Sequence, residues 1–531
     1  MNKSVLKRRI NDEYGVDPLN LCDKEESINM LRLVKIYHDL KEETNTQMVD
    51  DITWEDIEMD EVFFRVNHTR SFAGEQILYH MLHMIPNDTT KKQINKPKID
   101  EEADFFDTEE DIRVETEMKL HNIGKNYLKY YLPETIWNLD GLVMPRGFIY
   151  PLLLILLIIS IVLAIFKPVF IALTIFIAVI NLVVYMFVKM LYDNTITSLS
   201  SIRELVEFCE YIQKSDKLNA LYMNEELKKS VTILKRITKI LVYLKYTKAM
   251  VDSGNIQALI LDYIYGITMI DAICCSLAIK KLKNHKDEIL LLYELVGRVD
   301  SAISVASFRR SLDSCKPEIT ENGNISCRGL YHPLLNSPVK NDFNMKKNSF
   351  FTGANATGKS TFMKAIAINV ILGETIYTCT ADGMSFPQMY VMTSMALRDD
   401  VLNGESYYVR EIKYLKRMIE KVESGEKTLI VIDEILKGTN TKERVAASKA
   451  VLEYLSDTFA IVITATHDIE LVTQMADLYD AYYFECIVRD GTVKFIYEIR
   501  EGINKITNAI ELMKGMGFPD KIITSAESGR G

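Results

Sequence analysis

The chain has 531 residues, of which 48% are hydrophobic and 26% are charged, and its formal net charge is −10 at pH 7. This length suffices for two or three domains, and the negative charge excludes a broadly basic nucleic-acid-binding surface while leaving room for a local basic patch. The eight cysteines form no C-x-x-C pair and have no histidine at zinc-ligand spacing, so we expect reduced thiols and no cysteine-based metal site.

Residues 1–146 are charged and mostly helical in pattern, which predicts an N-terminal helical region. Its most acidic part is "DEEADFFDTEEDIRVETE", residues 100–117. Because a run of like charge repels itself and favours water, we expect this stretch to be a solvated face or loop. An interaction motif is the alternative.

Two long apolar runs follow, at residues 148–166 and 169–188, and neither contains a charged residue. At about 1.5 Å per residue, each run covers roughly the 30 Å of a bilayer core. A pair of buried core helices is the alternative, but helices inside soluble domains usually show one polar stripe. The runs therefore predict a transmembrane helical hairpin over residues 147–190.

The residues around the two runs indicate how the hairpin is oriented. Lys167 and Pro168 make the tight turn in "AIFKPVF", and Arg146 and Lys189 flank the open end. Two spans return the chain to its starting side, so we expect a multi-pass protein of the cell membrane with both soluble parts in the cytoplasm. Asn181 in the second span could form a hydrogen bond to the first, and a tolerated polar residue without such a role is the alternative.

Residues 191–315 show apolar positions at helical spacing with few glycines and prolines, as in "ILLLYELVGRVDSAISVASFRR". This pattern predicts long, packed helices. The composition changes near Pro317, where "KPEITENGNISCRGLYHPLLN" brings turn residues and short β-branched runs. We therefore expect a second soluble domain over residues 316–531.

That domain contains a phosphate-binding motif within "SFFTGANATGKSTFM". A strand-like run precedes the G-x-x-x-x-G-K-S pattern and a helical one follows it, as the motif requires. Its glycines allow backbone N–H groups to wrap phosphates, while the lysine meets the β- and γ-phosphates and the serine binds Mg²⁺. The loop residues that we expect to contact ATP are Gly353, Ala354, Asn355, Ala356, Thr357, Gly358, Lys359, Ser360 and Thr361.

Two further apolar strands end in polar residues. In "KTLIVIDEILKGTNT" the strand ends at Asp433 and Glu434, so we expect Asp433 to hold Mg²⁺ together with Ser360, and Glu434 to activate the attacking water. In "AIVITATHDIEL" the strand ends at Thr466 and His467, where the histidine could contact the γ-phosphate or be structural. These residues predict a P-loop ATPase that uses ATP and Mg²⁺.

The order of these motifs, together with "DDVLNGESYYVREI" and the closing "GINKITNAIELMKGMGFPDKIITSA", resembles the ATPase domain of the MutS mismatch-repair family over residues 330–529. The resemblance implies an ABC-type fold, C-terminal dimerisation helices and a homodimer. It also implies that Ser406 reaches the partner's γ-phosphate in trans, that Glu411 follows as the associated acid, and that His467 is a catalytic switch histidine. More weakly, the helical region from about residue 50 resembles the family's core and lever.

The sequence also departs from that family pattern. Ala354 replaces proline, Thr357 replaces glycine or serine, Tyr408 replaces phenylalanine, and Leu436-Lys437 replaces glycine-arginine, but no catalytic group is lost. The core-like segment begins too early to leave room for an N-terminal mismatch-reading domain, so we expect none. The isolated triplet Phe208-Cys209-Glu210 is interpreted as coincidence.

The predicted fold is thus an α/β ABC-type P-loop ATPase domain at the C-terminus, preceded by an all-α core and lever region that a transmembrane hairpin interrupts. Two functions remain open. The first is a membrane-anchored ATPase that couples dimer closure to engagement of DNA. The second is an ATP-driven membrane switch or scaffold that acts on protein or lipid partners. A transporter is disfavoured, because two spans form a thin pathway and no L-S-G-G-Q signature precedes Asp433.

Overall fold

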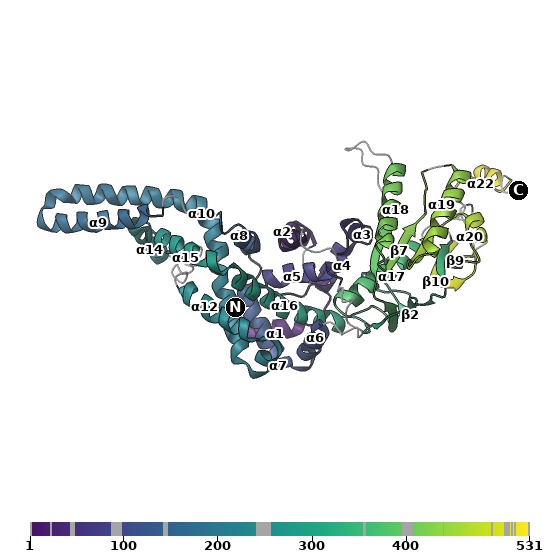
Figure 1. Ribbon diagram of the computed structural model, residues 1–531, viewed down its shortest axis with the longest axis horizontal. Coiled ribbons are helices and arrows are strands. Elements are labelled where there is room, and N and C mark those ends of the chain that lie inside the picture. Colours follow the sequence, from purple (N-terminus) through teal and green to yellow (C-terminus); the bar gives the residue numbers. More distant parts are fainter. Residues whose placement is uncertain are drawn as a thin grey trace.

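The computed structural model describes residues 3–21, 24–42, 48–85, 98–141, 147–239, 256–353, 357–395, 407–438, 440–489, 492–503, 510, 513 and 517–528. The molecule is elongated, with a helical hairpin at one end, an α/β region at the other and a helical region between them (Figure 1). This arrangement confirms the prediction of a helical N-terminal part followed by an α/β C-terminal part.

The helical region before the hairpin consists of short helices that pack around the central helix α16. Its elements are α1 (Lys3–Glu13), η1 (Pro18–Asn20), α2 (Lys24–Glu42), α3 (Asp51–Asp56), α4 (Met59–Val66), α5 (Phe72–His83), α6 (Lys98–Thr108), α7 (Glu110–Ile123), η2 (Tyr127–Tyr131) and α8 (Leu132–Trp137). After the hairpin come α11 (Asp216–Tyr222), α12 (Glu225–Thr238), α14 (Ile256–Thr268), α15 (Ile270–Leu282), η5 (Lys283–His285) and α16 (Lys286–Arg310).

A buried carboxylate fastens α16 to the start of α5. Asp300 of α16 is fully buried, and it accepts hydrogen bonds from the backbone N–H and the hydroxyl of Ser71 at 2.8 and 2.6 Å and from the N–H of Arg70 at 3.0 Å. Ser71 in turn caps α5 through the N–H of Gly74. A Cβ atom on Gly74 would overlap the carboxylate of Asp300, so this close approach requires glycine. Burial raises the pKa of Asp300, and these donors oppose the shift.

The acidic stretch at residues 100–117 confirms the predicted solvated face in part, because its exposed acids are Glu101, Asp104, Asp107, Glu110, Asp111 and Glu115. It forms α6 and most of α7, and Asp100 and Glu102 are buried. Arg298 contacts Glu102 at 2.8 Å and Arg309 contacts Asp100 at 2.9 Å, both from α16. Burial raises the pKa of Glu102 to about 7 although Arg298 opposes the shift. The arginines that stabilise these acids lie almost 200 residues further along the chain, beyond the reach of a local pattern.

The hairpin consists of α9 (Ile149–Phe166), η3 (Pro168–Phe170) and α10 (Ile171–Lys214). Two helical segments are long and apolar enough to cross a membrane, Ile149–Phe166 with a mean hydropathy of 3.0 and Pro168–Met190 with 2.7. Only 17% and 11% of these segments are buried, so most of their apolar side chains face outwards, unlike those of a core helix. The boundary expected at residue 190, between the hairpin and the following helical region, falls inside α10. This helix continues without a break into the helical region.

Asn181 does not bond to the first span. Its side-chain N–H donates to the carbonyl of Ile267, in α14, at 2.8 Å. The helix α14 therefore lies beside the second helix of the hairpin.

The α/β region contains two sheets. Its strands are β1 (Glu318–Thr320), β2 (Ser326–Leu330), β3 (Asn341–Asn344), β4 (Asn348–Thr352), β5 (Gly383–Pro387), β6 (Tyr390–Ser394), β7 (Thr428–Asp433), β8 (Ile461–Ala465), β9 (Tyr479–Arg489) and β10 (Thr492–Glu501). Its helices are α17 (Lys359–Thr375), α18 (Tyr407–Glu423), α19 (Thr441–Ser456), α20 (Ile469–Gln474) and α22 (Asp520–Ser528). The smaller sheet has the order β1-β5-β2-β3, and the larger has the order β10-β9-β4-β8-β7-β6.

In the larger sheet, every strand from β9 to β6 pairs in parallel with its neighbours, and only β10 is antiparallel. The carboxyl ends of β4, β7 and β8 therefore meet at one edge. In open α/β sheets this edge is where ligands bind.

The helical and α/β regions share an interface and a continuous hydrophobic core. At the interface, the short helix α3 docks on β6, the edge strand of the larger sheet. The carboxylate of Asp56 accepts hydrogen bonds from the hydroxyl of Thr393 at 2.7 Å and from the N–H of Met395 at 2.8 Å. The two regions are thus joined by buried polar contacts as well as by apolar packing.

A pH-dependent loss of stability is expected from Glu374, at the end of α17. This side chain is fully buried, its Oε1 accepts from the N–H of Met389, and burial raises its pKa from the ordinary 4.5 to about 8. Because the folded pKa exceeds the unfolded one, this contribution to stability is complete below pH 4.5 and falls as the pH rises toward about 8. We expect Glu374→Gln to flatten the decline in melting temperature between pH 5 and 8. A variant that declines as steeply as the parent would contradict this assignment.

Candidate nucleotide-binding site

The predicted phosphate loop connects the end of β4 to the start of α17. Gly353 has φ 129° and Gly358 has φ 99°, conformations that side chains disfavour, and Gly358 caps the first turn of α17. The N–H groups at this helix N-terminus are unsatisfied within the helix and favour an anion. The Nζ of Lys359 donates to the carbonyl of Gly353 at 2.7 Å. Burial lowers the pKa of Lys359, and the charges of Asp433 and Glu434 oppose the shift. Residues 354–356 lie outside the described part of the chain.

Ser360 and Asp433 form the candidate magnesium site. The hydroxyl of Ser360, in the first turn of α17, donates to Oδ2 of Asp433, at the end of β7, over 2.6 Å. Hydroxyl and carboxylate oxygens suit Mg²⁺, which usually takes one or two carboxylates plus phosphates and water. Among the described residues, no group of three or more His, Cys, Asp and Glu side chains could hold a metal ion.

Glu434 follows Asp433 and lies in a small polar network. Its φ is 62°, and its backbone N–H donates to the carbonyl of Ala465 at the end of β8, so the turn directs its side chain toward the residues after β8. Its carboxylate lies 3.2 Å from Nε2 of His467 and 3.2 Å from Nζ of Lys437. The hydrogen bond with His467, and then Lys437, lowers the pKa of Glu434 to about 2. The carboxylate is therefore ionised and engaged with two partners.

Glu411 has a structural role that the sequence did not reveal. Its buried carboxylate accepts a hydrogen bond from the N–H of Lys437 at 3.1 Å, and so holds the loop that follows Glu434. Burial raises the pKa of Glu411, while the backbone donors of this loop oppose the shift. A Cβ atom on Gly438 would come within 2.8 Å of the Cβ of Tyr408. The departures from the family pattern at residues 408 and 436–437 thus lie in one packed contact.

A bidentate ion pair also lies beside the site and was not predicted. Arg444 of α19 donates to the two carboxylate oxygens of Asp468 over 2.9 and 2.8 Å. Asp468 follows His467, so this pair restrains the turn on which the histidine lies. This ion pair was difficult to predict from the sequence, because Arg444 and Asp468 lie in different elements.

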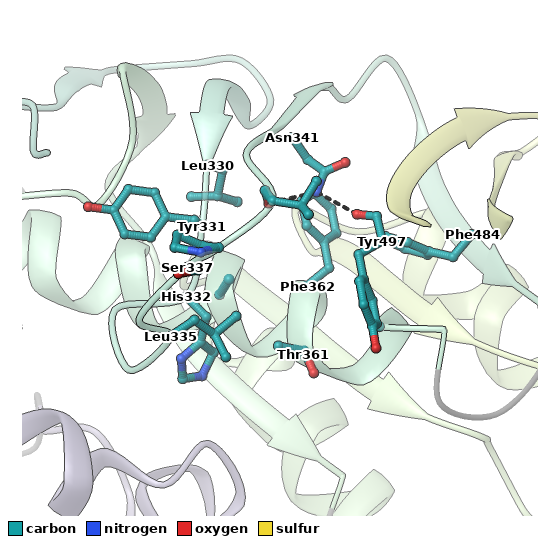
Figure 2. A pocket seen from close by; sticks show the side chains of 14 residues that line it. Leu330, Tyr331, His332, Leu335, Ser337, Asn341, Thr361, Phe362, Phe484 and Tyr497 are labelled. Carbon is teal, nitrogen blue, oxygen red and sulfur yellow. Dashed lines mark hydrogen bonds between the residues drawn. The ribbon is translucent and has the colours of Figure 1, made fainter. Parts of the chain in front are cut away.

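A pocket of about 450 Å³ adjoins the first turn of α17 (Figure 2). Figure 2 shows Leu335 and Tyr497 on opposite sides of it, with Thr361 and Phe362 between them. Its lining residues are Leu330, Tyr331, His332, Leu335, Ser337, Pro338, Val339, Asn341, Gly358, Thr361, Phe362, Ala365, Phe484 and Tyr497. Sequence reasoning missed this pocket, apart from the loop residues Gly358 and Thr361.

One side chain holds the aromatic wall of the pocket in place. The side-chain N–H of Asn341 donates to the carbonyl of Tyr497 at 2.9 Å, and its oxygen accepts from the N–H of Ile499 at 2.8 Å. Tyr497 has φ 60° and lies at an irregularity between β9 and β10. Burial lowers the pKa of His332 to about 4, so its imidazole is neutral at pH 7. The pocket is therefore largely apolar with uncharged polar groups, a lining suited to a small organic ligand.

The structure thus brings together Gly353, Thr357, Gly358, Lys359, Ser360 and Thr361 of the loop with Asp433, Glu434 and His467. Ser406 lies outside the described residues, one position before α18 begins. Its action in trans remains a prediction.

Comparison with known proteins finds similarity to one family over the part of the chain that contains this site. The profile of MutS domain V matches residues 349–530. The chain is MutS-like. It is 29% identical to the DNA mismatch repair protein MutS of Pseudothermotoga lettingae over 268 residues, which are 48% of this chain and 32% of the relative.

Two further relatives carry the same name. The protein from Fusobacterium nucleatum is 30% identical over 256 residues, 46% of this chain and 28% of the relative. The protein from Halalkalibacterium halodurans is 26% identical over 285 residues, 51% of this chain and 33% of the relative. The chain therefore spans about a third of the length of the curated relatives that it matches, and the family match lies within residues 349–530.

Substitutions at Glu434 and Lys359 are expected to separate hydrolysis from binding. Glu434→Gln keeps the shape of the side chain but cannot accept a proton from water, so we expect ATP binding to persist and turnover to fall by about 10²–10⁴-fold. Lys359→Ala removes a charged donor to phosphate, which costs about 1.5–3 kcal/mol and weakens nucleotide binding about 10- to 100-fold.

Equilibrium binding of a fluorescent ATP analogue and steady-state phosphate release measure the two effects. Lys449→Ala and Glu453→Gln are matched controls, because this ion pair lies within α19 and contacts none of the site residues above. Hydrolysis by Glu434→Gln at the parental rate would reject the assignment of the base.

Proposed function

We propose that this chain is a membrane-anchored MutS-like ATPase that binds ATP with Mg²⁺ and hydrolyses it at the interface of a homodimer. The observation that carries the proposal is the convergence of Lys359, Ser360, Asp433, Glu434 and His467 at the N-terminus of α17. These residues come from three separate parts of the sequence, yet they lie at the shared carboxyl edge of β4, β7 and β8. Chance surface charges would not converge in this way.

The binding chemistry follows from the contacts of the loop. Lys359 now donates to the carbonyl of Gly353 and can exchange that neutral acceptor for an anionic phosphate oxygen, a stronger partner. Ser360 and Asp433 present the two oxygens for Mg²⁺, which when bound neutralises charge on the β- and γ-phosphates. The pocket beside Gly358 and Thr361 extends away from the loop and offers a place for the nucleoside.

The pairing of Glu434 links binding to hydrolysis. With a pKa of about 2, the carboxylate holds a proton poorly and is a weak general base. His467 and Lys437, its two partners, are both donors that a γ-phosphate would attract. Once they turn toward phosphate, the pKa of Glu434 rises and its freed oxygen can take a proton from water. The residues thus favour hydrolysis only after a triphosphate has entered.

The two apolar helices support the membrane anchor. They lie at the opposite end of the molecule from the ATPase-like region, and α10 continues from the second of them into the helical region (Figure 1). We place the soluble regions in the cytoplasm, where ATP is available. Dimer closure would complete each site with Ser406 of the partner and displace the helices that reach the hairpin.

DNA is the first candidate for a partner that the protein would bind on dimer closure, since the matched relatives are named as DNA mismatch repair proteins. A second candidate is an ATP-driven membrane switch that acts on proteins or lipids. The net charge of −10 and the position of the hairpin at the far end of the helical region favour this second function.

Stimulation of ATP hydrolysis by DNA distinguishes these functions. The full chain in lipid nanodiscs is assayed with and without duplex, branched and single-stranded DNA at 50 mM salt. If DNA is engaged, we expect a several-fold change in rate that fades by 200 mM salt, because phosphate contacts release counterions and weaken steeply over this range. Glu434→Gln controls for a contaminating ATPase. A rate unchanged by every DNA at low salt would reject DNA engagement and favour the membrane switch.

A mixture of two inactive variants tests the action of Ser406 in trans. A Ser406→Ala chain should fail to complete its neighbour's site, whereas a Glu434→Gln chain should fail only in its own. In a mixed dimer, one site then has an intact Glu434 and an intact partner Ser406, while the other site carries both defects. We expect each mixed dimer to recover about half the activity of a normal dimer if the sites act independently.

Phosphate release is measured on mixtures in which two affinity tags confirm mixed dimers. The controls are equal mixtures of two differently tagged copies of the same variant. Confirmed mixed dimers without recovered activity would contradict a pair of independent sites completed in trans.

A further inference from the structure

The helix α14 packs against the second apolar span of the hairpin. Besides the hydrogen bond from Asn181 to the carbonyl of Ile267, the backbone at Gly266 lies so close to Tyr185 that a Cβ atom there would come within 2.7 Å of the tyrosine ring. Tyr185 also donates to the carboxylate of Asp271, in α15, at 3.3 Å. These contacts fix the junction of α14 and α15 against the span.

That junction is a break in the helical backbone. Met269 has φ 56°, in the left-handed region, and separates α14 from α15. The last carbonyls of a helix lack partners within the helix, and inside a bilayer such groups must be satisfied by protein. Asn181, which is fully buried, supplies a donor to one of them. This contact gives a physical reason for an amide in an otherwise apolar span.

The depth of the junction follows from the position of Asn181. It lies eight residues before Lys189, the cation at the open end of the hairpin. Eight residues of helix correspond to about 12 Å, so the break would lie well inside the apolar layer if the span crosses it. A helix of 13 residues such as α14 is about 20 Å long and could reach this depth from the membrane surface.

One face of α14 is apolar and exposed. Ile260, Tyr263 and Ile264 are 55%, 54% and 47% exposed, and no described residue covers them. The neighbouring spans expose aliphatic side chains in the same way, Ile175 of α10 being 59% exposed. The exposed apolar surface of the hairpin thus continues onto α14.

We propose that α14 and α15 form a re-entrant helical turn, with the exposed face of α14 in contact with the lipid bilayer. The chain enters the apolar layer along α14, turns at Met269 and leaves along α15, which ends at the exposed Lys280 and Lys281. Lysines at this point suit the anionic headgroups of a cytoplasmic membrane surface. The proposal rests on the membrane anchoring of the hairpin.

The proposed re-entrant turn is connected to the ATPase-like region through α16. From α15 the chain passes through η5 into α16, whose last turn donates from Arg309 to the carbonyls of Ile376 and Tyr377 in the ATPase-like region. A helical path therefore joins the lipid-facing turn to the end of α17. The membrane contact made by α14 lies at one end of this path, and from the other end α17 extends to the candidate nucleotide site at its N-terminus.

Quenching of tryptophan fluorescence by brominated lipid tests the proposal. The full chain with Ile264→Trp is reconstituted in nanodiscs of ordinary or acyl-chain-brominated phosphatidylcholine. The parent, with Trp54 and Trp137, supplies the baseline. Ile175→Trp in the span is the positive control, and Tyr454→Trp, on the similarly exposed surface of α19, is the negative control. We expect Ile264→Trp to lose a fraction of its fluorescence similar to that lost by Ile175→Trp, because both would contact acyl chains.

A second variant tests the role of Asn181. Combined with Ile264→Trp, Asn181→Leu removes the donor to Ile267 and should reduce the quenching, whereas in the Ile175→Trp background it should leave the quenching unchanged.

The outcomes separate this inference from the membrane anchor. If Ile175→Trp is quenched but Ile264→Trp behaves like Tyr454→Trp, α14 is covered by protein or water, and the inference is overturned while the hairpin stands. If Ile175→Trp is also unquenched, the anchor itself is rejected, and the inference with it.

Discussion

The contact between Asp300 and the start of α5 fixes the central helix of this molecule. A carboxylate loses several kcal/mol of solvation when it is buried, and hydrogen bonds from Ser71 and Arg70 offset that loss. Because these donors lie at one helix N-terminus, α16 can occupy only one register against α5. The same helix meets the ATPase-like region through Arg309 and follows η5 at its other end. The position of both ends of the molecule therefore depends on this buried contact.

The candidate nucleotide site differs from this contact, since its polar groups are held by exchangeable partners. Lys359 bonds to a neutral carbonyl, Ser360 bonds to Asp433, and Glu434 is shared by His467 and Lys437. Each contact satisfies a polar group, and the donors Lys359, His467 and Lys437 would bond more strongly to a phosphate. The contacts of these groups would thus differ between the nucleotide-free and the nucleotide-bound state. Such a difference is what allows a ligand to shift a conformational equilibrium.

The sequence predicted those features that depend on local pattern. Strand β7 ends at Asp433, and β8 ends two residues before His467, so apolar runs followed by polar residues were sufficient, once parallel strands were assumed, to bring these groups to one edge. Features that depend on distant partners were not predicted. Asp100 and Glu102 of α6 are buried where Arg309 and Arg298 contact them, and the pocket wall depends on Asn341 reaching the bulge at Tyr497. The partner of Asn181 was missed for the same reason, because Ile267 follows Asn181 by 86 residues.

A physical route connects the site to the helical region at a second place besides α16. Helix α3 docks on the edge strand β6, where Asp56 binds Thr393 and the N–H of Met395. Residues 396–406, which end at Ser406, follow Met395 directly. In the proposed dimer closure, a change at this segment would therefore act on β6 at the point where α3 is attached. Since Asp56 is buried, a lost hydrogen bond there would cost about 1–3 kcal/mol, so α3 is expected to follow the strand rather than separate from it. The movement on proposed dimer closure would then be transmitted to the helical region through α3 and α16 together, and the helical region would move as one rigid body.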